Sequence, residues 1–104
     1  MVKIVWTELS VSDLKEIFNY IADDSVRFAS ITVGRIYNSV QLIIENPCIG
    51  RIVPEFKKKS IREIIEGNYR IIYRITNKQQ ADILRVYHVA RSLKSKNLKS
   101  KSQE

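Results

Sequence analysis

The sequence predicts an α+β domain with the element order β-α-α-β-β-β, in which a two-helix hairpin packs on one face of an antiparallel sheet. Three observations lead to this class. Apolar residues recur every three or four positions between residues 14 and 43, as on one face of a helix, and every second position from residue 60 to residue 89, as in strands. The length of 104 residues, with 44% hydrophobic residues and only 3 Gly and 2 Pro, suits a single packed domain.

The chain begins with a short predicted strand over residues 2–6, where Val2, Ile4 and Trp6 alternate with residues of the opposite face. A first helix follows, with Thr7 or Ser10 available as its N-cap. Four apolar residues share one face of this helix: Leu14, Ile17, Phe18 and Ile21.

Ser25 predicts the start of a second helix, because its side chain can accept hydrogen bonds from the unpaired N–H groups of a first helical turn. Asn46-Pro47 predicts its end, since proline disfavours helical geometry in the residue before it. The apolar stripe between these limits consists of Ala29, Val33, Ile36, Val40 and Ile43. Because the link between the two helices is short, they are expected to form a hairpin.

An irregular connection marked by Pro47, Gly50 and Pro54 leads to three further strands. We place these strands at residues 60–66, 69–76 and 81–89, and the links at 67–68 and 77–80 are short enough to require antiparallel neighbours. Residues 94–104 are polar and rich in lysine, so they cannot bury enough surface to order themselves. The chain is therefore expected to comprise a domain at residues 1–93 and a basic tail at residues 94–104.

The last two strands predict a basic surface. An even-numbered turn pairs Thr76 with Ala81, and this register directs an apolar set that includes Tyr69 and His88 toward the helices. The opposite face, which the helices leave bare, carries Arg70, Ile72, Arg74, Ile83, Arg85 and Tyr87. Guanidinium groups on such a face suit phosphate or carboxylate contacts, and exposed isoleucines are normally covered. We therefore expect a partner chain to bind this face.

The charge distribution indicates the same kind of partner. The net charge is +7, but residues 1–56 hold 5 basic and 7 acidic side chains, whereas residues 57–104 hold 13 basic and 4 acidic ones. Such a basic half attracts nucleic acid or an acidic protein segment. No apolar run is long enough to cross a membrane, and residues 1–3 lead into a strand rather than a signal peptide, so we expect a cytoplasmic protein.

Several kinds of site are excluded by the residues present. The sequence has no phosphate-binding glycine loop, and it has a single histidine, His88, and a single cysteine, Cys48, so neither a cofactor nor a metal site is predicted. We interpret His88 as a core or rim residue and Cys48 as a small loop or core residue. One catalytic alternative stays open, because metal-free RNA cleavage takes its nucleophile from the RNA 2′-hydroxyl and needs only arginine, lysine or tyrosine from the protein.

Several separate segments, in a consistent order, resemble the RelE/ParE family of bacterial toxins. The most extensive is IREIIEGNYRIIYRI at residues 61–75, followed by VYHVAR at residues 86–91. Trp6 before a helix, residues 13–25 and residues 46–55 are similar to the ParE branch. The resemblance covers residues 2–93.

This resemblance implies the toxin of a type II toxin–antitoxin system, of the plasmid-stabilisation kind, with the predicted fold. It further implies a partly disordered antitoxin that wraps the toxin in a hetero-oligomer, and growth arrest when the toxin is released. RelE-like members cut mRNA in the ribosome, whereas ParE-like members poison DNA gyrase and have no established nuclease centre.

Comparison of individual residues favours the ParE branch. Arg70 and Arg91 match arginines of the nuclease branch, so they are the catalytic candidates if the protein is an enzyme. The candidates for binding antitoxin or target are Arg91 and the six residues of the basic sheet face. Ile61 and Glu63 stand where the nucleases carry paired basic residues, and Asn97 stands near the place of their catalytic tyrosine. We therefore expect a gyrase poison without a catalytic centre. The alternatives are a ribosome-dependent mRNA endonuclease and a non-toxic basic binding module.

Overall fold

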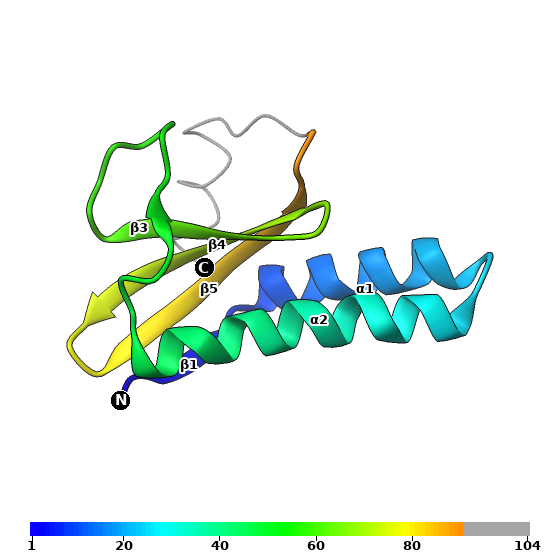
Figure 1. Cartoon of the computed structure of the whole chain (residues 1–104), viewed down its shortest axis with the longest axis horizontal. Helices are drawn as coiled ribbons and strands as arrows, with labels where there is room; N and C mark the ends of the chain where they lie inside the picture. Colours follow the sequence, from blue (N-terminus) through cyan, green and yellow to red (C-terminus); the bar gives the residue numbers. More distant parts are fainter. Residues whose placement is uncertain (91–104) are drawn as a thin grey trace.

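The computed structural model describes residues 1–90. Its elements are β1 (Lys3–Trp6), α1 (Glu8–Ala22), α2 (Val26–Glu45), β2 (Arg51–Ile52), β3 (Ile61–Glu66), β4 (Tyr69–Asn77) and β5 (Gln80–His88). The predicted α+β class is confirmed, with a helical hairpin on one face of a sheet (Figure 1). The short β2 lies in the connection that the sequence analysis treats as irregular.

The sheet has the strand order β1-β5-β4-β3-β2. Neighbours among β2, β3, β4 and β5 are antiparallel, whereas β1 pairs with β5 in parallel, with Ile4 opposite Ala81. The sheet is therefore mixed rather than wholly antiparallel. Short links fix the direction of the last three strands, but β1 is separated from β5 by the whole helical hairpin and three strands, so its direction is free of that constraint.

The two helices begin where side-chain oxygens accept backbone N–H groups. The Thr7 hydroxyl accepts from Ser10 N–H at 3.2 Å, and the Ser25 hydroxyl accepts from Phe28 N–H at 3.0 Å. The helices lie side by side, cover one face of the sheet, and extend beyond it at the end that carries their connecting turn (Figure 1). In the part of the chain that the structure describes, no helix is long and apolar enough to span a bilayer.

Two apolar clusters lie on opposite faces of the sheet. The larger one packs between helices and sheet, and its buried members are Val2, Ile36, Val40, Ile43, Ile71, Tyr73, Ala81, Ile83 and Val86. The smaller one lies on the face away from the helices and contains Val53, Ile72, Leu84 and Tyr87, with Phe56 and Ile61 packed against it. Both faces of the central strands are thus covered by apolar side chains.

The register of β4 and β5 differs from the predicted one over its middle section. Tyr69 lies opposite His88 as predicted, but Ala81 pairs with Ile75 and not with Thr76. Thr76 on β4 and Leu84 on β5 are left without an opposite residue, so each strand contains one bulge. Between the bulges the register is shifted by one residue, which turns Ile83 toward the helices and Leu84 away from them.

Candidate functional site

The expectation of a bare basic sheet face is wrong. Ile72 and Ile83 are 0% exposed, and Arg70, Arg85 and Tyr87 are also buried. The shifted register removes Ile83 from this face, and the segment after β2 folds back so that Val53 and Phe56 pack with Ile72. Arg74 alone among the predicted set is partly exposed, and it contacts Asp82 on the neighbouring strand at 3.4 Å.

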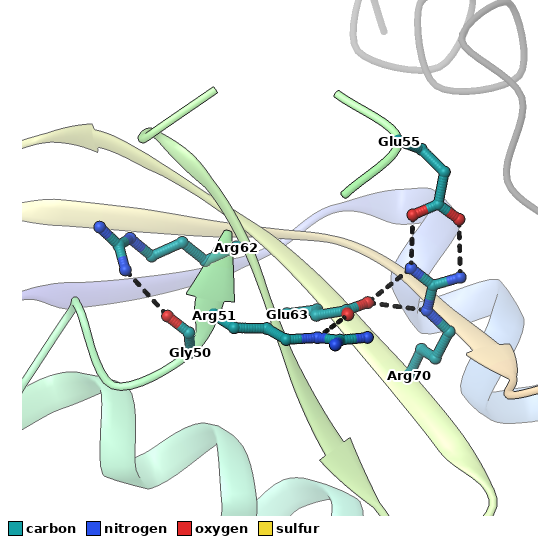
Figure 2. A network of polar contacts seen from close by, with 6 residues as sticks. All are labelled: Gly50, Arg51, Glu55, Arg62, Glu63 and Arg70. Atoms are coloured by element: carbon teal, nitrogen blue, oxygen red, sulfur yellow. Dashed lines mark hydrogen bonds and ion pairs between the residues drawn. The ribbon is translucent and has the colours of Figure 1, made fainter. Parts of the chain in front are cut away.

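The main polar feature of this face is a chain of four alternating charges, Arg51, Glu63, Arg70 and Glu55 (Figure 2). Glu63 extends from β3 and is 1% exposed, and its carboxylate lies between the guanidinium groups of Arg51 and Arg70. Arg70 Nε and Nη2 contact Glu63 Oε1 at 2.7 and 2.6 Å. We call these four residues the charged chain.

Glu55 completes the charged chain from the segment that folds over the sheet. It accepts from Arg70 Nη1 at 2.9 Å and from Nη2 at 3.0 Å, a bidentate pair. These hydrogen bonds raise the pKa of Arg70, while its burial acts in the opposite direction. All three guanidinium nitrogens of Arg70 are therefore engaged by carboxylates.

A second set of polar contacts fixes the turn that precedes β2. The Tyr73 hydroxyl accepts from Gly50 N–H at 2.9 Å and donates to the Pro47 carbonyl at 2.6 Å. Arg62 points away from the charged chain and donates to the Gly50 carbonyl at 2.9 Å (Figure 2). This turn places Arg51 beside Glu63, because β2 begins directly after Gly50.

Arg85 is also neutralised inside the protein. Its Nε and Nη2 donate to the two carboxylate oxygens of Asp13 on α1 at 2.7 and 2.8 Å, and its guanidinium lies 4.6 Å from the centroid of the Tyr87 ring. Burial alone would lower the pKa of Arg85, but the contact with Asp13 outweighs burial and raises it.

The other residues singled out from the sequence lie at the surface. His88 is an exposed rim residue that meets the edge of the Tyr69 ring at 5.7 Å between centroids, and its Nδ1 accepts from Ala90 N–H. Cys48 is exposed in a loop. Across residues 1–90, His, Cys, Asp and Glu form no group suited to holding a metal ion. Arg91, Asn97 and the 94–104 tail lie outside the described residues.

Three residues that organise the site were missed by sequence reasoning: Asp13, Arg51 and Glu55. Of the carboxylates that contact these arginines, only Glu63 could have been predicted from the sequence. The two-residue turn at 67–68 makes β3 and β4 neighbours, which brings Glu63 within diagonal reach of Arg70.

Comparisons with known proteins are consistent with this architecture. A family model described as the ParE toxin of type II toxin-antitoxin systems matches residues 4–93. Among solved structures, the chain resembles one from the chromosomal ParDE toxin–antitoxin system of P. aeruginosa, with a TM-score of 0.70 and 22% identity over 86% of this chain and 97% of that one.

The chain also resembles one from the RelBE2 toxin–antitoxin complex of Mycobacterium tuberculosis, with a TM-score of 0.54 and 22% identity over 84% of this chain and 96% of that one. No curated protein matches the sequence significantly. At these identities the structural matches establish a shared fold, and the family model establishes the relationship.

Proposed function

We propose that this chain, which belongs to the ParE toxin family of type II toxin–antitoxin systems, arrests growth by poisoning DNA gyrase. The same membership supports a cognate antitoxin as its partner, because the two similar solved structures both come from toxin–antitoxin systems. The toxin would then be stored in a hetero-oligomer with its antitoxin. A gyrase target also requires a cytoplasmic protein.

The observation that favours gyrase over mRNA cleavage is the state of Arg70. A guanidinium that stabilises a cleaved phosphate must present free N–H groups to the developing negative charge. Here Glu55 and Glu63 occupy all three nitrogens of Arg70, and the Glu63 carboxylate would repel a phosphate brought near it. Ile61 and Glu63, at the positions where the nuclease branch carries basic residues, add no positive charge.

The proposal is tested by giving the purified toxin two substrates in parallel. One reaction contains gyrase with relaxed plasmid DNA, and the other contains translating ribosomes with a defined mRNA. We expect inhibited supercoiling or trapped cleavage complexes in the first reaction and intact mRNA in the second. Codon-linked mRNA cuts that disappear in Arg70→Ala would instead establish the endonuclease.

Two controls make the result specific. Arg51→Gln alters a more exposed member of the charged chain, and circular dichroism confirms that each variant is folded before it is assayed. Brief expression of the intact chain in cells tests the remaining alternative, a non-toxic basic binding module. Unchanged growth would favour that module and contradict the proposed toxin activity.

A further inference from the structure

Three consecutive exposed lysines, Lys57, Lys58 and Lys59, lie in the connection between β2 and β3. We call these three residues the lysine loop. The connection lies on the side of the sheet away from the helical hairpin (Figure 1). None of the three ammonium groups forms an ion pair with a residue in the range 1–90. Within the described part of the domain, their positive charge is therefore not compensated.

The acidic residues closest in sequence do not neutralise the lysine loop. The Glu55 carboxylate forms the bidentate pair with Arg70, and Glu63 is buried within the charged chain. The Arg51 side chain on the edge strand β2 is 65% exposed, so it adds a guanidinium at this edge of the sheet. Residues 51–62 hold five basic side chains and one acidic side chain, which gives this segment a net charge of +4.

Hydrogen bonds fix the backbone of the lysine loop before any ligand binds. Lys57 N–H donates to the Val53 carbonyl at 3.0 Å, and Ile61 N–H donates to the Lys58 carbonyl at 3.1 Å. Lys57 has a φ of 54°, and within residues 1–90 every other positive φ belongs to a glycine. A lysine in this conformation carries a cost that glycine would avoid, and residues held in this way are typical of binding sites.

The side chains of this segment favour the phosphate backbone of a double helix. An ammonium group binds phosphate as a point charge and does not need the planar geometry of a guanidinium. Duplex DNA carries about one negative charge per 1.7 Å of its axis, so neighbouring lysines can each contact a phosphate. Proteins that hold single strands use exposed aromatic side chains that stack on the bases. Phe56, the one aromatic residue in the sequence from 50 to 66, instead packs against the smaller apolar cluster.

We propose that the lysine loop, together with Arg51, binds the phosphate backbone of duplex DNA without reading its sequence. The inference rests on the proposed function for its setting, because gyrase acts on duplex DNA and a toxin bound to gyrase would lie beside that DNA. The affinity for DNA can be measured without gyrase. This inference and gyrase poisoning are therefore tested by separate measurements.

The experiment measures the affinity of the full-length toxin for a short labelled DNA duplex by fluorescence anisotropy at several salt concentrations. The loop variant combines Lys57→Gln, Lys58→Gln and Lys59→Gln, which removes the charges and keeps the length of the side chains. The control variant combines Lys3→Gln, Lys15→Gln and Lys78→Gln. It removes the same positive charge from exposed lysines on β1, on α1 and in the turn between β4 and β5. Circular dichroism confirms that both variants are folded.

We expect the loop variant to raise the Kd for duplex DNA by about tenfold or more and the control variant to raise it by less than about threefold. The slope of log affinity against log salt concentration should become shallower by about 2 to 3 in the loop variant, since each lost phosphate contact removes about 0.9 from it. The control variant should keep the wild-type slope.

Equal losses of affinity in the two variants would overturn the proposal, because net charge alone would then account for DNA binding. Tighter binding of the wild-type toxin to single-stranded RNA than to duplex DNA would also overturn it. The same holds for a loop variant that loses affinity for the antitoxin and keeps its affinity for DNA. A wild-type toxin that binds duplex DNA through the lysine loop and leaves gyrase active would support this inference and refute gyrase poisoning.

Discussion

Arg70 Nε donates a 2.7 Å hydrogen bond to Glu63 Oε1, joining two neighbouring strands on the sheet face that the helices leave open. The Glu63 side chain is fully buried, so it relies on Arg70 and Arg51 for compensation of its charge. The hydrogen bonds that join these strands also occupy the guanidinium of Arg70, which would have to be free to contact a phosphate.

Arg70→Ala is expected to lower the free energy of unfolding by about 3–5 kcal/mol, because it leaves Glu63 buried with one partner fewer and Glu55 with none of its bidentate contact. Arg51→Ala is the matched comparison. The Arg51 side chain is 65% exposed, so its removal is expected to cost about 1 kcal/mol or less. Urea denaturation measures both, and equal losses would contradict the central place of Arg70.

Gly50→Ala is expected to destabilise the protein by about 1–3 kcal/mol. A Cβ at Gly50 would lie 2.6 Å from the Glu63 carbonyl oxygen and 2.7 Å from the Tyr73 hydroxyl, so backbone would have to move. Gly34→Ala is the control: a Cβ there meets nothing within 4 Å, and alanine is the better helix former, so a gain of up to about 1 kcal/mol is expected. Thermal unfolding that moves in opposite directions for the two variants would bear this out.

Tyr73→Phe removes the acceptor of Gly50 N–H and is expected to cost about 1–3 kcal/mol at pH 7. Burial raises the pKa of Tyr73, so above about pH 10 the unfolded chain loses this proton while the folded protein keeps it. Wild-type stability should therefore fall as the pH rises past that point, and the difference between wild type and variant should shrink. Urea titrations from pH 7 to pH 11 measure this, and a constant difference would refute the assignment.

The Asp82→Asn variant tests how the free energy of unfolding depends on pH under acidic conditions. Burial would raise the pKa of Asp82, but hydrogen bonds from Gln80, Thr76 and Arg74 together lower it. The stabilisation by this carboxylate is then complete above about pH 4 and is lost as the pH falls through the folded pKa.

We expect the Asp82→Asn variant to lose about 1 kcal/mol at pH 7 and to show a shallower decline on acidification than wild type. Asp24→Asn, in the exposed turn between the helices, is the matched control for the loss of a surface carboxylate. Parallel acid-denaturation curves for wild type and Asp82→Asn would exclude the predicted role.

The helices and the three long strands were predictable because apolar periods of 3.6 and 2 persist over most of each element, although the bulges at Thr76 and Leu84 interrupt the period of 2. Thr7 and Ser25 cap the helices as expected, and the bounds of β3 to β5 lie within one residue of the predicted ones. The family was likewise identifiable, because motifs from the whole domain occur in one order. The family model confirms it over residues 4–93.

The prediction of an exposed basic sheet face was wrong for two physical reasons. A turn fixes the register of two strands only as far as the first bulge. The bulges at Thr76 and Leu84 compensate each other, so Tyr69 pairs with His88 as predicted although the register between the bulges is shifted. In addition, the carboxylates that neutralise the arginines come from distant or irregular parts of the chain. Asp13 is 72 residues from Arg85, and Glu55 lies in a segment whose path no periodicity describes.

Asp13 does more than neutralise Arg85, because its Oδ2 also accepts Val86 N–H at 2.9 Å. β1 pairs with β5 only as far as Ile83, so within residues 1–90 Val86 lies on a stretch of β5 that has no neighbouring strand on that side. An open strand of this kind is a template for the stacking of identical chains into aggregates. The Asp13 carboxylate occupies a backbone donor of that edge with a side chain from a helix, and such coverage is one of the ways in which proteins disfavour edge-to-edge pairing.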